Sequence, residues 1–409
     1  MQQLNVYLHN RMVGVLSSDK GKLQFIYSQD YLQLKDAEPL AFTLPLTNST
    51  YQNSAVVSFF SNLLPDESVR VRIAEILGIS PENTFGLLQA IGEDCAGAIS
   101  LFVPEKQPAA VNIPIYKPLT EDEAHKVLVG LPERPLNIGE KDFHISGAGA
   151  QDKLVASVRD GQILLPLNGT PSTHIIKPGM ERFPESVFNE LYCMKLAKKC
   201  GLNCAECDII FIKDIPYYIT ARYDRKKEND LWYRLHQEDF CQLLGYEPSV
   251  KYESEGGPKI QQCFALLREL ELPANDTIEF IDRIIFNFLI GNGDAHAKNF
   301  SILYTDTRPI LAPAYDLIST AVYPAIEQRM AMKIDNEYTF RWITIGKFIR
   351  MGEKAGFSEK IILKEIQKMQ KILHKNIDGF TADIKKKYPA NIYDKIYAGI
   401  INRIEQLKQ

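Results

Sequence analysis

The chain has 409 residues, of which 45% are hydrophobic and 24% are charged. This balance excludes a disordered tail, a collagen-like repeat and a small disulfide-stabilised protein, and the length predicts two or three structural units. The formal net charge of -4 comes from 47 basic and 51 acidic residues, so the chain has no overall positive field that would hold nucleic acid by its phosphates.

The first hundred residues open with three strand-like runs, NVYLHN, MVGVLSS and KLQFIY, which predict a small antiparallel sheet. Helical periodicity follows in VRVRIAEILGI, which Gly78 ends, and again in residues 83–91. The proline-rich residues 104–118 predict a linker. We place the first domain boundary there, after an N-terminal α/β subdomain at residues 1–105.

A mixed region follows, with strand runs LVASV, ILLPL and THIIKP, a helix over residues 186–200 that Gly201 ends, and strands CDIIFIK and YYITARYD. The charged run RKKEND is interpreted as a mobile loop. From Glu238 onward the pattern is helical. We therefore predict a strand-rich lobe at residues 118–235 and a helical lobe at residues 236–409, an order typical of proteins that hold a nucleotide between two subdomains.

Localisation and redox state follow from what the chain lacks. No stretch approaches the roughly 18 uninterrupted apolar residues of a membrane span, and the start MQQLNVYLHN is not a signal sequence, so we expect a cytoplasmic protein with no membrane partner. Seven scattered cysteines favour reduced thiols. Cys200, Cys204 and Cys207 could begin a zinc site, but no fourth ligand lies near them, and we favour small buried thiols.

The most informative segment is the polar loop GNGDAHAKN at residues 291–299, which follows the apolar run IIFNFLI. Asp294 and Asn299 have the spacing of the catalytic loop of protein kinases. A carboxylate there can accept the proton of an acceptor hydroxyl, and an amide oxygen can help to hold magnesium on the phosphates. The same residue types also suit a plain turn, so the loop alone leaves both interpretations open.

Two further residues favour the catalytic interpretation. Asp316 ends the run LAPAYD, and a magnesium nucleotide needs a second carboxylate, although no Phe-Gly pair follows and an aspartate there could also be a helix N-cap. Lys177 lies on the apolar strand THIIKP, where its ammonium group needs an anion such as a phosphate. Glu190, in the next helix, is either the partner of Lys177 or an ordinary exposed glutamate.

Residues 144–153, HISGAGAQDK, form a loop of small side chains before a strand. Small residues allow backbone N–H groups to approach a phosphate closely. The segment matches neither the Walker A motif nor the glycine-rich loop of protein kinases, and a plain turn would explain it equally well.

Together these segments resemble the HipA kinases, serine/threonine kinases best known as toxins of bacterial type II toxin–antitoxin pairs. The resemblance covers residues 1–330 and also includes NLLPD at 62–66, GEDCAGA at 92–98, QEDFCQ at 237–242 and KYESEGGP at 251–258. It implies an α+β, two-lobed, protein-kinase-like fold with a small N-terminal α/β subdomain and a helical C-terminal lobe.

The resemblance also implies roles for individual residues. Asp294 is the counterpart of the catalytic aspartate, and Asn299 and Asp316 are the counterparts of the magnesium ligands. Lys177 corresponds to the lysine on the ATP phosphates, with Glu190 as its possible partner.

The remaining ATP-binding positions implied by the family are Ala148, Gly149, Ala150, Gln151, Asp152, Lys153, Ala221, Arg222, Tyr223, His296, Ala297, Lys298 and Tyr315, in addition to Asn299 and Asp316. Ala221 stands where a glutamate is often found, which leaves only backbone atoms to contact adenine there. Ser146 falls where the family autophosphorylates. A phosphate there adds about -1.5 to -2 charges and would repel ATP, so we expect it to silence the kinase.

The implied function is a Mg²⁺- and ATP-dependent serine/threonine kinase that modifies a protein, such as an aminoacyl-tRNA synthetase, to inhibit translation and growth. A HipB-like helix-turn-helix antitoxin would neutralise it and provide its only link to DNA. One alternative is a small-molecule kinase, which the N-terminal unit disfavours. The other is a DNA-bound co-repressor pseudokinase, which is disfavoured by the presence of four active-site residues, Lys177, Asp294, Asn299 and Asp316. The basic runs at residues 225–227 and 385–387 are interpreted as solvated loops.

Overall fold

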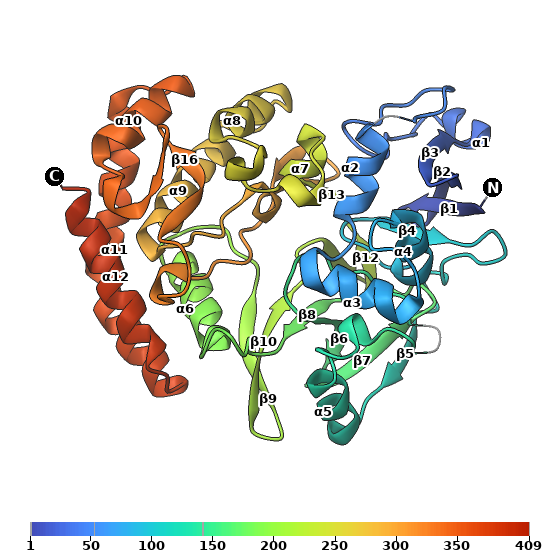
Figure 1. Ribbon diagram of the computed structural model, residues 1–409, viewed down its shortest axis with the longest axis horizontal. Coiled ribbons are helices and arrows are strands. Elements are labelled where there is room, and N and C mark those ends of the chain that lie inside the picture. The colour runs from blue at the N-terminus through green and yellow to red at the C-terminus, as the bar shows by residue number, and fades with distance from the viewer. Residues whose placement is uncertain (1, 53, 141–142, 409) are drawn as a thin grey trace. The chain divides into compact units, whose positions relative to one another are not determined.

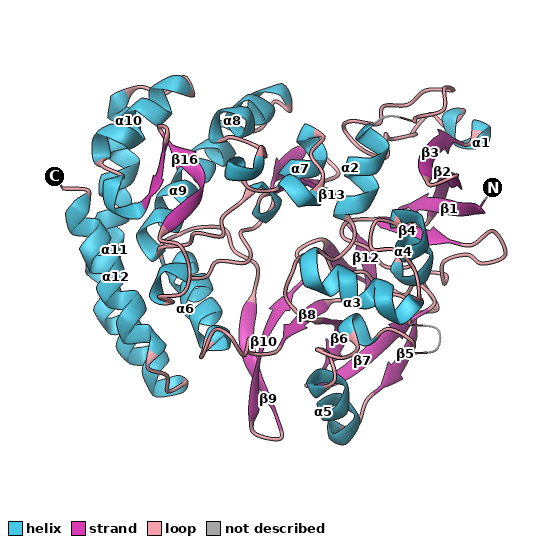
Figure 2. Ribbon diagram, viewed as in Figure 1, coloured by secondary structure: helices cyan, strands magenta, loops and turns pink. Residues whose placement is uncertain are grey.

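The computed structural model describes residues 2–52, 54–140 and 143–408, and the chain divides into two compact units. The first comprises Met1–Pro178, Ile210–Ser249 and Leu303–Arg308, and the second comprises Gly179–Ile209, Val250–Ile302 and Pro309–Gln409. Both units mix helices with strands, as Figures 1 and 2 show, which agrees with the predicted α+β class. The three domains at residues 1–105, 118–235 and 236–409 stay a prediction.

The first unit begins with the predicted antiparallel sheet. Its strands run in the order β3-β2-β1-β4, with bounds β1 Gln2–Leu8, β2 Arg11–Asp19, β3 Lys22–Tyr27 and β4 Ile99–Phe102. Four helices accompany it: α1 Gln29–Leu32, α2 Ser54–Asn62, α3 Glu67–Leu77 and α4 Thr84–Ile91. The predicted helix ends are confirmed, because Gly78 takes the left-handed conformation after α3 and Asn83 caps α4 through its side chain.

A six-stranded sheet follows, in which only residues 207–209 are assigned to the second unit. Its order is β5-β7-β6-β8-β10-β9, and its strands are β5 Ile115–Pro118, β6 Leu154–Arg159, β7 Gln162–Leu167, β8 His174–Lys177, β9 Cys207–Ile212 and β10 Ile215–Ala221, with helix α5 at Glu121–Val129. The predicted linker at residues 104–118 is wrong at its end, because β5 pairs there with β7, Ile115 opposite Leu167. One hydrophobic core runs through both sheets. The proline-rich segment therefore lies within a compact unit.

The run RKKEND is not a mobile loop. It forms β11 (Arg225–Glu228), which pairs with β12 (Leu231–Arg234) across a turn at Asn229 and Asp230, and both turn residues have positive φ angles. Asn and Asp tolerate this conformation better than most residues do. Strand β13 (Gln237–Asp239) and helix α7 (Phe240–Leu244) follow, and Asp239 and Gln242 form a capping box at the start of α7.

The second unit is built mainly on helices. They are α6 Ser186–Lys199, α8 Ile260–Glu269, α9 Ala274–Ile290, α10 Ile345–Lys354, α11 Glu359–Lys387 and α12 Ile392–Gln406. Every residue of α9 from Phe280 to Ile290 is buried, and α9 contacts both α11 and α12. Aromatic pairs such as Phe264 with Phe280, at 5.0 Å between ring centroids, fill this core.

The helical prediction for residues 236–409 missed several short strands. These are β13, β15 Pro309–Leu311, β16 Arg329–Ile334 and β17 Glu337–Thr339, whereas β14 Ser301–Tyr304 is the strand that the run NFSILY predicts after the Asp294 loop. Residues 385–387 were expected in a loop and instead form the last turn of α11, where positive charge suits the helix C-terminus. Lys385 Nζ lies 2.6 Å from Asp394 Oδ2.

All seven cysteines are buried as reduced thiols, as predicted. Burial raises the pKa of Cys200 and of Cys204 to about 12. Nowhere in the described ranges do three metal-ligating side chains of the His, Cys, Asp or Glu type come together. In the same ranges, no helix combines the length and apolar character needed to cross a bilayer.

Candidate active site

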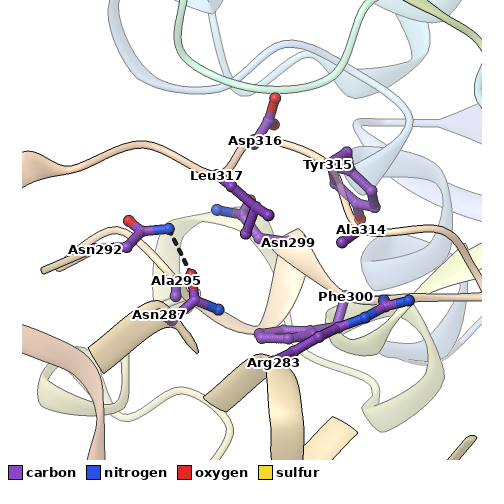
Figure 3. A pocket seen from close by; sticks show the side chains of 10 residues that line it. All are labelled: Arg283, Asn287, Asn292, Ala295, Asn299, Phe300, Ala314, Tyr315, Asp316 and Leu317. Carbon is purple, nitrogen blue, oxygen red and sulfur yellow. Dashed lines mark hydrogen bonds between the residues drawn. The ribbon is translucent and has the colours of Figure 1, made fainter. Parts of the chain in front are cut away.

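The second unit carries the loop with Asp294, which begins where α9 ends. Gly291 has a φ of 70°, and its N–H bonds back to the last turn of α9, so the chain leaves the helix sharply. Asn292 donates to Asn287 Oδ1 at 2.9 Å, shown as a dashed line in Figure 3, and its own Oδ1 accepts from Asp294 N at 3.0 Å. These bonds fix the backbone on both sides of Gly293.

The carboxylate of Asp294 is partly open to solvent, with 46% of its side chain exposed. Asn299 ties the loop together by donating from Nδ2 to Asp294 O at 2.8 Å, which leaves its amide oxygen available as a ligand. Tyr252 donates to Asp294 Oδ1, and His296 Nε2 lies 3.8 Å from the same oxygen. No lysine or arginine of the described residues forms an ion pair with Asp294.

Asp316 and Tyr315 follow on a second segment of the same unit. Tyr315 donates to Lys298 O at 2.7 Å and shares a hydrogen bond with the hydroxyl of Ser301 at 2.6 Å, which joins this segment to the Asp294 loop. Asp316 has a φ of 53°, a left-handed conformation that costs energy in residues other than glycine and is tolerated best by Asn and Asp. Backbone strain of this kind is concentrated at functional sites.

A small pocket lies where these two segments meet. Figure 3 shows the side chains that line it: Arg283, Asn287, Asn292, Ala295, Asn299, Phe300, Ala314, Tyr315, Asp316 and Leu317. The structure thus brings Asn299 and Asp316 to one place, as the sequence predicted. An amide oxygen and a carboxylate are the hard donors that Mg²⁺ prefers, and this ion usually takes its other ligands from water and substrate phosphates, so the donor set fits the ion.

The first unit carries the other predicted residues. In the loop of residues 148–153, Lys153 Nζ donates to Ala148 O at 2.6 Å, and Asp152 forms an ion pair with Arg72 of α3 at 2.7 Å. Gly149 has a φ of 102°, which favours glycine. Asp66 N donates to Gly149 O at 3.3 Å, so the loop is held against the N-terminal region by its backbone.

Lys177 ends strand β8, between β6 and β10, and only 4% of the residue is exposed. It pairs in register with Tyr218, and its Nζ lies 5.5 Å from the centre of the tyrosine ring. Glu190 is buried in α6 of the second unit. The alternative interpretation as an exposed glutamate is therefore wrong, and the pairing of Glu190 with Lys177 stays a prediction.

Comparison with known proteins identifies the family. A model described as the HipA N-terminal domain matches residues 4–102, and one described as the HipA-like C-terminal domain matches residues 145–377. The serine/threonine-protein kinase toxin HipA of Shewanella oneidensis is 30% identical over 381 residues, which cover 90% of this chain and 86% of that protein. The chain belongs to the HipA family of serine/threonine kinases.

Other HipA relatives support the same assignment. A candidate kinase of Sinorhizobium fredii, Y4mE, is 40% identical over 369 residues, which cover 89% of this chain and 88% of that protein. The solved complex of Shewanella oneidensis HipA with HipB and its operator DNA contains a chain that matches with a TM-score of 0.85 and 28% identity, and the match covers 99% of this chain and 97% of that one. The predicted HipA-like fold is confirmed.

Within this HipA-family kinase, Ser146 is almost fully buried in the first unit. Its hydroxyl donates to Leu63 O at 2.5 Å, and its backbone N–H donates to Asp94 O at 3.2 Å. Residues 62–66 and 92–98 were quoted above only as family motifs. The structure shows that both of them hold the loop that begins at Ser146.

The segment Ala221 to Tyr223 begins at the last residue of β10. The Arg222 backbone N–H bonds to Thr173 O at 2.9 Å, while its guanidinium turns into the interior and bonds to Asp224 and to Ser172. Tyr223 donates from its hydroxyl to Gln237 Oε1. The Arg222 side chain is thus committed to the protein interior, which leaves backbone groups for any nucleotide contact there.

Two residues at these sites were not predicted to have roles. Tyr252 contacts Asp294, and Asp94 accepts hydrogen bonds from the three arginines at positions 222, 225 and 234. Both lie in motifs already recognised, KYESEGGP and GEDCAGA, so the signal was present in the sequence. The spacing of residues alone could not show which partner each side chain would find.

Proposed function

We propose that this chain transfers the γ-phosphoryl group of ATP to a hydroxyl group of a protein. Asp294 orients the acceptor hydroxyl and takes its proton as the new O–P bond forms and ADP leaves. Asn299 and Asp316 would hold Mg²⁺, which when bound neutralises charge on the phosphates. Lys177 and the loop of residues 148–153 bind the phosphates, and the backbone of residues 221–223 binds adenine.

One observation carries the proposal: Asp294 keeps an accessible carboxylate that pairs with no lysine or arginine of the described residues, on the same loop as Asn299 and next to the segment of Asp316. Among the described residues no guanidinium or ammonium group takes up the oxygens of this carboxylate, so it can accept a hydrogen bond from an acceptor hydroxyl. His296 and Lys298 belong to the same loop, residues 291–299, which supports the proposed role in nucleotide contacts.

The test compares the purified chain with Asp294→Asn. We expect the variant to lose about 10²- to 10⁴-fold in the rate of phosphate transfer from labelled Mg-ATP, the usual contribution of a positioned base. The amide keeps the size of the carboxylate, so both proteins should unfold at the same temperature. Equal transfer by the two folded proteins would refute the proposed catalytic role.

We further propose that Ser146 is the site of self-inactivation. Its buried hydroxyl must leave Leu63 O to be modified, and a phosphoserine with about -1.5 to -2 charges could not return to that apolar position. The loop would then stay displaced from the phosphate site. Mass spectrometry after incubation with Mg-ATP should find phosphate on Ser146, together with falling activity, and Ser146→Ala should stay active. A loss of kinase activity without phosphate on Ser146 would contradict this proposal.

The proposed partner is a HipB-like helix-turn-helix antitoxin, which would bring the kinase to DNA and inhibit it. The solved Shewanella oneidensis assembly contains HipA, HipB and operator DNA, which supports this. Affinity purification from the native cell should recover a small helix-turn-helix protein, and the chain should shift operator DNA only when that protein is present. Direct binding of DNA by the chain alone would contradict the proposal.

The proposed substrate is a protein of translation, by resemblance an aminoacyl-tRNA synthetase. Phosphoproteomics of cells that express the wild type or Asp294→Asn should show a synthetase modified only by the wild type, together with arrest of growth. If the two strains grow equally and their phosphoproteins are the same, the toxin function is wrong.

A further inference from the structure

Tyr252 reaches the carboxylate of Asp294 from outside the catalytic loop. Its hydroxyl donates a hydrogen bond to Asp294 Oδ1, and its ring meets the ring of His296 edge to face, with centroids 5.0 Å apart. His296 Nε2 lies 3.8 Å from the same carboxylate oxygen. One oxygen of the proposed base is therefore occupied by a phenol and flanked by an imidazole.

The loop that carries Tyr252 is tightly built. Gly257 N donates to Tyr252 O at 2.9 Å, and a Cβ on Gly257 would come within 2.0 Å of Val250 O, so only glycine fits there. Glu253 Oε2 accepts from Lys333 N on β16 at 2.7 Å. These contacts fix the backbone of Tyr252. Its side chain is half-buried, so a rotation about χ1 is the movement that would release Asp294 without a change in the loop backbone.

We propose that Tyr252 determines which hydroxyl groups reach Asp294: it occupies the base when no acceptor is bound and gives way to the acceptor hydroxyl. The inference rests on the proposed kinase function. An acceptor must donate to Asp294 the same kind of bond that the phenol donates, so the two hydroxyls compete. A protein substrate can displace Tyr252 because it brings binding energy from its other contacts, whereas a water molecule brings none.

The consequence is protection of ATP against hydrolysis. In hydrolysis a water oxygen bonds to the γ-phosphorus, its proton passes to Asp294, and the bond to ADP breaks. Tyr252 opposes this step by holding the carboxylate oxygen that would orient the water. Tyr252→Phe keeps the ring and removes only the hydroxyl. Its initial rate of phosphate release from Mg-ATP, with no protein acceptor present, should rise about five-fold, the factor that corresponds to one net hydrogen bond.

The rise should appear in kcat, with the KM for ATP unchanged, because Tyr252 competes with the attacking water and not with the nucleotide. Tyr397→Phe is the matched control. The Tyr397 hydroxyl, in α12, also donates to an aspartate, Asp378 Oδ1, at 2.8 Å, and it lies outside the Asp294 loop and the Tyr252 loop. This variant should leave hydrolysis unchanged. Melting temperatures of both variants verify that they are folded.

Three results would overturn the inference. A fall in kcat for Tyr252→Phe would make the phenol a mere support of Asp294, and an unchanged kcat would remove any role. Phosphate on Tyr252 in the wild type, found by mass spectrometry, would make it an acceptor. Failure of the proposed function has a different signature, because Asp294→Asn would then release and transfer phosphate as the wild type does.

Discussion

Two aspartates in this chain are used in opposite ways. Asp94 in the first unit is fully buried and meets Arg225, Arg234 and Arg222 at 2.8, 2.7 and 3.4 Å. Asp294 in the second unit stays half open to solvent and accepts from the neutral donor Tyr252. A carboxylate surrounded by guanidinium groups is held in its charge and place, whereas one that accepts from a single neutral hydroxyl can exchange that donor for another hydroxyl.

The pKa of Asp94 shows which effect dominates. Burial alone would raise this pKa, but the positive charges of Arg225, Arg234 and Arg222 outweigh burial, and the net shift is downward. Ser172 adds hydrogen bonds from its hydroxyl at 2.5 Å and its backbone N–H at 3.0 Å. The cluster joins the GEDCAGA motif to the segment after β10, so its role is to hold structure.

The largest expected effect comes from breaking this cluster. Asp94→Asn leaves three buried guanidinium groups with one negative partner fewer, and we expect a loss of about 3–5 kcal/mol in the free energy of unfolding. Urea unfolding followed by circular dichroism measures it. Asp36→Asn is the control, because the Asp36 ion pair with Arg11, also 2.7 Å long, is exposed and its loss should leave no measurable change.

The distinction between a structural Asp94 and a catalytic Asp294 is wrong if Asp294→Asn lowers the free energy of unfolding as much as Asp94→Asn does. We expect the reverse pattern, in which Asp94→Asn lowers stability and Asp294→Asn lowers only the rate of phosphate transfer. Equal losses of stability would mean that both carboxylates are structural.

Glu238 provides an intermediate case, because it is fully buried but has only neutral donors. Tyr304 donates to its Oε1 at 2.7 Å and Phe42 N donates at 2.9 Å, while its Oε2 is without a partner in the described structure. Burial raises the pKa of Glu238 from 4.5 to about 7, against the smaller opposing effect of these bonds.

The raised pKa of Glu238 predicts a pH dependence with a definite sign. Between pH 4.5 and about 7 the folded state holds a proton that the unfolded state has released, so stability falls as pH rises, by at most about 3 kcal/mol. Glu238→Gln retains an oxygen that can accept from both donors and cannot ionise. Relative to wild type, the variant should gain stability between pH 5 and pH 8 in urea unfolding. Parallel pH curves for the two proteins would contradict the assignment.

Much of the fold could be predicted from local pattern. The alternation in β1 to β3 and the apolar stripes of α3, α9 and α12 identify elements whose residues are buried together. Gly78 and Gly291 mark helix ends because both take the left-handed conformation that ends a helix. Hairpin β11–β12 was missed because its stability depends on Asp94, which lies 131 positions before Arg225. No local window contains that partner.

At the candidate site, too, local features could be predicted from the sequence and contacts between distant residues could not. Spacing indicated that Asp294 and Asn299 belong to one catalytic loop, and the family resemblance implied that Asn299 and Asp316 act together. The side chains of Asn299 and Asp316 line the same pocket. Spacing could not reveal Tyr252, because the bond to Asp294 spans 42 positions and depends on how the KYESEGGP loop turns. Nor could it reveal that Arg222 faces inward, because a charged residue after a strand is exposed in most proteins.

The smallest change in stability is expected at Lys227, two residues after Arg225, where one of the largest is expected. Arg225 is buried against Asp94, whereas Lys227 forms an ion pair at 2.8 Å with Asp230 in which both side chains are exposed. Solvent screens such a pair, so Lys227→Ala should leave the urea midpoint unchanged within error, while Arg225→Ala should lower it clearly. We propose that the chain does not contact DNA directly. Lys227→Ala should therefore leave the mobility shift of operator DNA with the chain and the antitoxin unchanged. A loss of that shift would show that the basic run contacts DNA, and a lowered midpoint would show that Lys227, too, belongs to the structural cluster.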